Sequence, residues 1–160
     1  MALLENKIRQ EKIDAAVVNA SISGETTSGG KARLPALLKQ HQPDVVIIEL
    51  GGNDGLRGLP VKSAMANLTD MVKASQAAKA KVLLVGMQIP PNYGPDYARQ
   101  FARMYSTIAK ESDIKLVPFL LEGVAENPEL FQADRIHPQA QAQPIMLDNI
   151  WPQLKPLLGK

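Results

Sequence analysis

The sequence predicts an α/β fold in which a parallel sheet lies between two layers of helices. Short apolar runs alternate along the chain with segments of helical periodicity. One run, Val45-Val46-Ile47-Ile48, is β-branched throughout and does not alternate with polar residues, which is typical of a strand covered on both faces. Strands that alternate with helices favour a three-layer arrangement with right-handed crossovers.

The strands of this sheet are predicted from four apolar runs. Each run has six residues, an ordinary length for a strand. The runs are Ala15–Ala20, Val45–Leu50, Val82–Met87 and Lys115–Leu120.

Helices are predicted where apolar residues recur every three or four positions. Leu3, Leu4 and Ile8 form such a face at once, so we expect the chain to begin inside an α/β unit whose preceding strand is absent. Pro144 and Pro152 are expected to bend or interrupt the last helix. The later stripes are Leu34, Leu37 and Leu38; Val61, Met65, Leu68 and Val72; Tyr97, Phe101, Met104 and Ile108; and Ile145, Leu147, Ile150 and Leu154.

Composition limits the functions open to the chain. Its 160 residues, 45% apolar and 21% charged, fit one soluble globular domain spanning 1–160. A net charge of +2 gives no reason to expect nucleic acid or an anionic membrane as a partner. The absence of cysteine excludes disulfides and thiolate chemistry. No apolar run approaches the roughly 20 residues of a membrane helix, so no membrane insertion is expected.

The first residues carry no secretory signal pattern, because no basic region precedes an apolar stretch. As written, the chain is expected in the cytoplasm. A longer precursor with a signal would place it in the periplasm or outside the cell.

Two loops offer hydrogen-bond donors at the carboxyl ends of predicted strands. Gly24 follows the first strand, and Gly52-Asn53 follows the second. These ends face one crevice in an open α/β sheet, so a glycine N–H and the Asn53 amide could both stabilise the negative oxygen of a tetrahedral intermediate. The alternative is that Gly24 and Asn53 only shape turns, as these residue types often do.

An acid–base pair is predicted near the C-terminus, in Ala133-Asp134-Arg135-Ile136-His137-Pro138. Asp134 could bind one ring nitrogen of His137 and fix its tautomer, which would leave the other nitrogen as a general base. The alternative is an Asp that caps a turn beside a solvent-exposed His. The pair gains weight because it lies last in the chain, after two loops of the right kind.

These motifs resemble those of the SGNH (GDSL-type) hydrolases, and most closely the bacterial arylesterase, thioesterase I and lysophospholipase L1 group. The resemblance implies a flavodoxin-like fold with a five-stranded parallel sheet. It also implies that Gly24 and Asn53 are oxyanion donors and that Asp134 and His137 are the acid and base. The matching segments are 18–26, 32–38, 49–58, 91–94 and 134–138.

The chain departs from the family pattern in lacking its first block, a strand that ends in Gly-Asp-Ser-Leu. That block brings the nucleophilic serine, a third oxyanion donor and the strand expected between Ala15–Ala20 and Val45–Leu50. We therefore expect an N-terminally truncated domain whose usual first, central strand is missing. A start site inside a longer reading frame and a deliberate or natural truncation would both explain this.

The missing block has two expected consequences. Ser21 and Ser23 are the nearest substitute nucleophiles, although both also occur in family members with the usual serine; otherwise His137 would activate water directly. Uncovered strand edges favour association, so we expect a homo-oligomer.

The favoured function is hydrolysis of small acyl esters or thioesters, including short-to-medium acyl esters, aryl esters and lysophospholipids. Ile89, Pro90 and Tyr93 are expected to line the path of the acyl chain, unless Ile89 and the prolines only stiffen a loop. Acid–base and nucleophilic chemistry implies no metal or organic cofactor. The alternatives are a nucleophile-deficient fold that binds acyl ligands without turnover, and a fragment that self-associates without a ligand.

Overall fold

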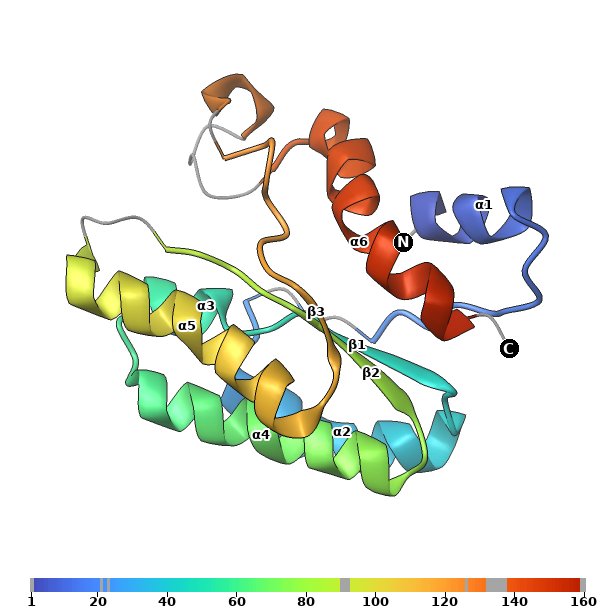
Figure 1. Ribbon diagram of the computed structural model, residues 1–160, viewed down its shortest axis with the longest axis horizontal. Coiled ribbons are helices and arrows are strands. Elements are labelled where there is room, and N and C mark those ends of the chain that lie inside the picture. Colours follow the sequence, from blue (N-terminus) through green and yellow to red (C-terminus); the bar gives the residue numbers. More distant parts are fainter. Residues whose placement is uncertain are drawn as a thin grey trace. The chain divides into compact units, whose positions relative to one another are not determined.

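The computed structural model describes residues 2–20, 22, 24–89, 93–125, 127–131 and 138–158 (Figure 1). Contacts within the chain divide it into two compact units. The sheet unit comprises Ala20–Pro118, and the terminal unit comprises Met1–Asn19 together with Phe119–Lys160. Gly24, Asn53 and the sheet all belong to the sheet unit.

A three-stranded parallel sheet forms the centre of the sheet unit. In its register, Val45 lies opposite Lys81, and Leu83 lies opposite Lys115. The predicted α/β class with a parallel sheet is confirmed, and three of the four predicted strands form, each ending before its apolar run does. The strands, in spatial order, are β1 (Val45–Ile48), β2 (Lys81–Val85) and β3 (Lys115–Val117).

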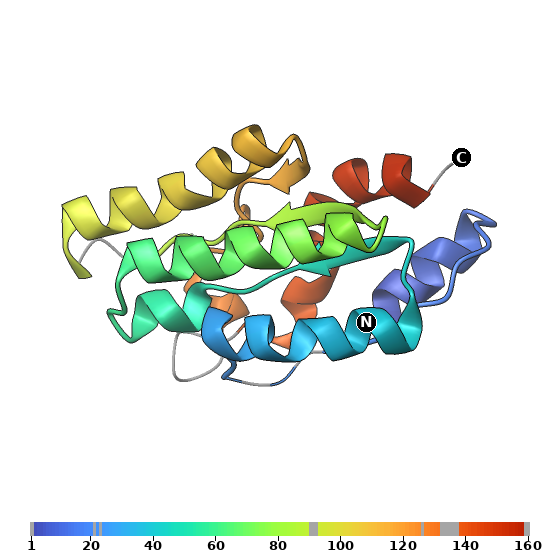
Figure 2. The ribbon, with the colours of Figure 1, turned by 90° about the horizontal axis from the view of Figure 1, so that it is seen from below.

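Helices alternate with these strands along the sheet unit. The three long ones, α2, α4 and α5, run side by side in Figure 2, and α4 and α5 contact the sheet directly. Each contains the apolar stripe that predicts it. The short helix α3, directly after Gly51, is not predicted by any periodicity. The bounds are α2 (Thr27–His41), α3 (Gly52–Leu56), α4 (Val61–Ala77) and α5 (Pro95–Ser112).

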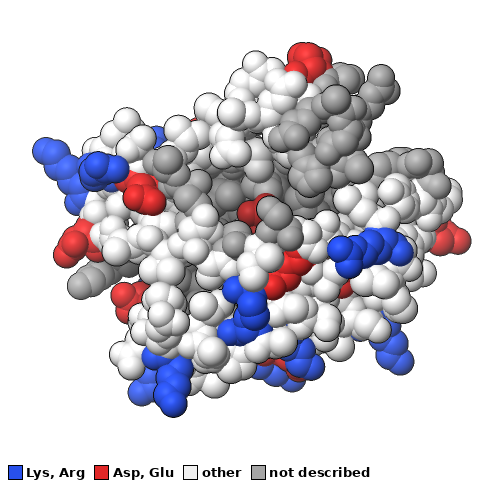
Figure 3. Space-filling view, turned by 180° about the vertical axis from the view of Figure 1, so that it is seen from behind, with Lys and Arg blue, Asp and Glu red and all other residues white. Residues whose placement is uncertain are grey.

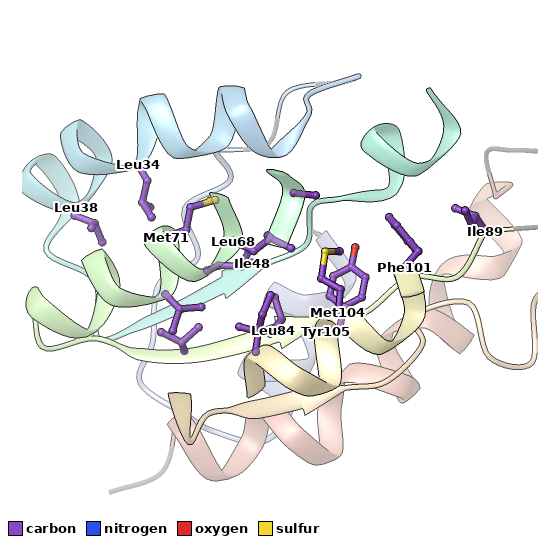
Figure 4. Packing of buried hydrophobic residues seen from close by; sticks show 14 residues of the cluster. Leu34, Leu38, Ile48, Leu68, Met71, Leu84, Ile89, Phe101, Met104 and Tyr105 are labelled. Atoms are coloured by element: carbon purple, nitrogen blue, oxygen red, sulfur yellow. The ribbon is translucent and has the colours of Figure 1, made fainter. Parts of the chain in front are cut away.

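One cluster of buried apolar side chains holds these elements together (Figure 4). Ile48 of β1 and Leu84 of β2 point into it, and Leu68 of α4 meets them. The rings of Phe101 and Tyr105 on α5 pack edge to face, with centroids 5.6 Å apart. Burying a large apolar side chain contributes roughly 1.5–3 kcal/mol, so this cluster is the main stabilising element of the sheet unit.

The terminal unit brings the two ends of the chain together. Lys7 lies over the ring of Trp151, 5.6 Å from its centroid, and Lys155 binds the carboxylate of Glu11 at 3.1 Å. The last helix continues through Pro152 and is not interrupted there. The unit contains α1 (Ala2–Gln10), α6 (Gln143–Leu158) and two short 3-10 helices, η2 (Pro128–Leu130) and η3 (Ala140–Ala142).

The predicted strand at Ala15–Ala20 does not form, and that prediction is wrong for this structure. These residues are neither helix nor strand, and Val18 is 55% exposed. A strand is stable only when its peptide groups pair with a neighbour. Among the described residues, those of this segment are not assigned to any strand, so its apolar composition alone does not make it one.

The outer edge of β1 is open within the part of the chain that the structure describes. The Lys81 N–H donates to the Asp44 carbonyl at 2.9 Å. The N–H and C=O of one residue point to the same side of a strand, and that side alternates from residue to residue. Val46 and Ile48 therefore turn these groups towards β2, as Asp44 does. The peptide groups of Val45 and Ile47 therefore point to the open side.

No described helix is both long and apolar enough to cross a bilayer. On the face drawn in Figure 3, basic and acidic side chains are interspersed, without a broad patch of one sign.

Candidate active site

The turn that follows β1 depends on a glycine. Gly51 has a φ of 113°, a conformation that side chains rarely adopt, and a Cβ there would collide with the hydroxyl of Tyr105. That hydroxyl donates to the Leu50 carbonyl at 2.7 Å. Burial, and then the nearby carboxylates, raise the pKa of Tyr105 well above its usual value, so Tyr105 stays protonated and keeps this bond. The turn thereby fixes where α3 begins.

Helix α3 holds the segment that carries Gly24. The Asn53 side-chain amide donates to the Glu25 carbonyl at 3.1 Å. The Asp54 carboxyl group accepts from the Thr27 N–H at 2.8 Å and from its hydroxyl at 2.7 Å. Two consecutive residues of α3 thus bind the 24–27 segment at two points, although the segments lie far apart in the sequence.

Asp54 is buried, and it caps helix α2 from outside that helix. Thr27 is the first residue of α2, and the N-cap residue Thr26 makes no side-chain cap of its own. Helix N-termini carry free N–H groups and partial positive charge, which a carboxyl oxygen satisfies well. Asn67 of α4 donates to the Thr27 hydroxyl at 3.1 Å, so three helices meet at this point.

Gly24 has free space at its Cα, and it precedes Glu25, whose carbonyl Asn53 binds. Its φ of 78° lies in the left-handed region, and a Cβ added there would meet nothing within 4 Å. Within the described residues its N–H has no hydrogen-bond partner, and one of the two Asn53 amide hydrogens is likewise uncommitted. The Asn53 amide binds the carbonyl of Glu25, the residue that follows Gly24 in the sequence. This arrangement can bind an anionic oxygen.

An ion pair braces the same loop. Arg33 of α2 binds both carboxylate oxygens of Glu25 at 2.7 Å and also donates to the Ala20 carbonyl at 2.8 Å. The hydrogen bond from Arg33 lowers the pKa of the Glu25 carboxyl below its usual value, and partial burial opposes that shift. Arg57 lies close to the Gly24 carbonyl, at 3.4 Å.

Several predicted site residues lie outside the described residues. These are Ser21, Ser23, Pro90, Asp134 and His137. Of the other two predicted lining residues, Ile89 is buried and packs into the core cluster, where it fills the space beside Gly55. Tyr93 is exposed.

The structure adds residues that the motifs did not single out. Asp54 and Arg33 lie inside quoted segments, yet nothing in their spacing shows that one is buried and the other braces a loop. The available signal is chemical: an acidic residue directly after Asn53, and an arginine seven residues after Thr26 in an otherwise apolar stripe. Among the described residues, no group of three or more acidic or histidine side chains is placed to hold a metal ion.

Comparison with known proteins shows to which family the chain belongs. A family model described as the GDSL-like Lipase/Acylhydrolase family matches residues 1–144. The chain belongs to this family. By homology it is an ester hydrolase of the SGNH type, and the resemblance seen in the sequence is confirmed.

Two curated relatives and one solved structure place the chain within the GDSL-like family. Esterase TesA of Pseudomonas aeruginosa is 53% identical over 99% of this chain and 79% of its own length. Thioesterase 1/protease 1/lysophospholipase L1 of Escherichia coli is 46% identical over 99% of this chain and 74% of its own. The crystal structure of TesA, also 53% identical, matches with a TM-score of 0.95 over 98% of this chain and 87% of that one.

The buried contact between α3 and α2 yields a stability prediction. Asp54→Ala leaves two buried donors of Thr27 without an acceptor, and each such donor costs roughly 1–3 kcal/mol. We expect the free energy of unfolding, from urea titration followed by circular dichroism, to fall by about 3 kcal/mol. Asp70→Ala is the matched control, because it removes an exposed ion pair worth about 0–1 kcal/mol. Equal losses in the two variants would contradict the capping role.

The Glu25–Arg33 pair yields a pH prediction. Because the pKa of Glu25 is lower in the folded chain than in the unfolded one, the pair stabilises the fold fully above the unfolded pKa of about 4.3. That contribution is lost as the pH falls through the folded pKa. The difference in unfolding free energy between the native chain and Glu25→Gln should stay constant above about pH 5 and shrink below it. A difference that grows on acidification would refute the assignment.

Proposed function

We propose that the chain hydrolyses acyl esters and thioesters at the site formed by Gly24 and Asn53, with Asp134 as the acid and His137 as the base. One observation carries the proposal: the Asn53 amide binds the carbonyl next to Gly24, so the two oxyanion donors belong to one braced loop pair. Family membership supports the reaction class. We also propose that 1–160 forms a single domain of this family, in the three-layer flavodoxin-like arrangement.

The substrate class rests on the relatives. TesA is named an esterase, and the Escherichia coli relative carries the names thioesterase and lysophospholipase. A carbonyl held by Gly24 and Asn53 is common to esters and thioesters. We propose that exposed Tyr93 contacts the acyl chain, that Pro90 also lines its path, and that buried Ile89 supports this region from the core. No metal or organic cofactor enters this chemistry.

The proposed mechanism has two candidate nucleophiles, a serine hydroxyl and a water molecule. Ser23 precedes Gly24 directly and Ser21 lies three residues before it in the sequence, so these serines are the proposed substitute nucleophiles. The other route is direct activation of water by His137, without an acyl-enzyme. Oxyanion stabilisation and binding without a serine nucleophile still support roughly a 10³–10⁴-fold acceleration over water.

The open edge of β1 supports a second proposal, association of the chain with a second copy. Among the described residues, no strand pairs with the outward N–H and C=O groups of Val45 and Ile47, and β1 carries no lysine or proline that would discourage pairing. A second copy of β1 would satisfy these groups across a two-fold axis. The alternatives to hydrolysis are a nucleophile-deficient fold that binds acyl ligands without turnover, and a fragment that self-associates without a ligand.

Hydrolysis is tested by a fluorophosphonate label mapped by mass spectrometry, combined with a chromogenic butyrate ester assay. We expect turnover, and Asn53→Ala should lower the rate constant about 10²–10³-fold, the usual effect of removing one oxyanion donor. Asn6→Ala is the matched control, since Asn6 is exposed on α1.

The label separates the two routes. An adduct on Ser21 or Ser23 together with turnover identifies a relocated nucleophile. If the native chain turns over the ester without forming an adduct, and His137→Ala abolishes that turnover, the nucleophile is activated water. If the chain shows no turnover and no adduct, the hydrolase proposal is refuted for this chain and the binding alternative is left.

Association is tested by light scattering at micromolar concentration. We expect the mass of a dimer or larger assembly, and Ile47→Lys should release monomers, because a charge at the β1 edge opposes pairing. Leu59→Lys is the matched control: Leu59 is 38% exposed and Ile47 is 37% exposed, but Leu59 lies outside the strands. A native chain that is monomeric, or two variants that behave alike, would contradict pairing through β1.

A further inference from the structure

We propose that Arg33 is a positioning residue for the reaction, because it fixes the loop that presents the Gly24 N–H. The inference rests on the proposed function and deepens it. Arg33 does not touch the reacting atoms: it acts through Ala20 and Glu25, the two residues that bound the loop. Its helix, α2, supplies the rigid base.

The contacts of Arg33 close the loop at both ends. Its Nε binds Glu25 Oε2 at 2.7 Å and its terminal nitrogen binds Oε1 at 2.7 Å, which is the bidentate geometry that a guanidinium favours. The same terminal nitrogen donates to the Ala20 carbonyl at 2.8 Å. One side chain therefore ties together two points five residues apart, with Gly24 between them.

Helix α2, which carries Arg33, is fixed by contacts of its own. The first turn of α2 is capped by Asp54, and Leu34, the next residue after Arg33, packs into the core cluster. From the opposite side, Asn53 binds the Glu25 carbonyl. Arg33 of α2 thus binds the side chain of Glu25, and Asn53 of α3 binds its backbone carbonyl. Gly24 is the adjoining residue.

Such bracing matters for an oxyanion donor more than for stability. The Arg33 side chain is 33% exposed, and ion pairs near the surface contribute only about 0–1 kcal/mol to folding. A donor that moves by about 1 Å, in contrast, loses up to about 10²-fold in rate. Loss of Arg33 should therefore change the site far more than it changes the fold.

The chemistry also requires arginine and not merely a positive charge. Lysine is a point charge and cannot hold a carboxylate at two oxygens while it also binds a carbonyl in a fixed plane. Arg33→Lys should keep the ion pair but release Ala20, which separates charge from geometry.

The experiment uses the full chain labelled with ¹⁵N-glycine, which gives one amide signal for each of the 11 glycines. The Gly24 signal is assigned from its loss in Gly24→Ala. Ethylphosphonate, a stable tetrahedral anion, is the probe, and its titration is followed at that signal. Arg33→Lys and Arg33→Ala are compared with the native chain, and Arg99→Ala is the control because Arg99 pairs with Asp96 on the exposed surface of α5. Circular dichroism verifies that each variant is folded.

We expect Arg33→Ala to shift the Gly24 signal and weaken ethylphosphonate binding about 10- to 100-fold, with Arg33→Lys intermediate and Arg99→Ala unchanged. Millimolar guanidinium should restore binding in Arg33→Ala and have no such effect on the native chain. In the butyrate assay the loss should appear in kcat with KM nearly constant, because the acyl chain binds elsewhere.

The outcomes separate this inference from the proposed function. If the Gly24 signal of the native chain ignores ethylphosphonate, Gly24 is no anion donor, and the proposed function fails with the inference. If the native chain binds the anion and folded Arg33→Ala binds it equally well, the positioning role alone is refuted. A lower melting temperature without a change in anion binding also refutes that role, because the ion pair is then merely structural.

Discussion

The two hydrogen bonds from Thr27 to Asp54 are the interaction on which the candidate site depends. They join the start of α2 to α3, and they bury a carboxyl group that no cation neutralises within the described residues. A five-residue helix such as α3 is not stable alone, because helix nucleation is unfavourable. The same bonds that cap α2 therefore also hold α3, and neither element is independent of the other.

From this joint the site extends outward in two directions. Asn53, beside Asp54, binds the Glu25 carbonyl, and Arg33, on α2, binds the Glu25 carboxylate. Gly24 adjoins these supports, and a Cβ added to it would meet no atom within 4 Å. The sheet contributes the position of α3 through the Gly51 turn, where the chain leaves β1 beneath the Tyr105 hydroxyl. Donor geometry is thus set by polar contacts, and their placement by the apolar core.

Much of this arrangement follows from the sequence, and the rest depends on contacts that sequence cannot encode locally. The β-branched run at 45–48 and the stripes of α2, α4 and α5 are local signals, and each element forms. Gly24 and Asn53 are expected at one edge of the sheet and lie together. Ala15–Ala20 fails as a strand because pairing is a property of two segments. The burial of Asp54 and the bracing by Arg33 could not be predicted, since both arise only when distant segments meet.

The double duty of Asn53 has an evolutionary consequence. One amide hydrogen of Asn53 binds the Glu25 carbonyl, and on the proposed function the other binds the oxyanion, so a substitution there alters architecture and reactivity together. A residue under two simultaneous demands has few acceptable replacements. On the proposed function, we therefore expect substrate preference to change through positions without this double role, such as the exposed ring of Tyr93, and not through Asn53.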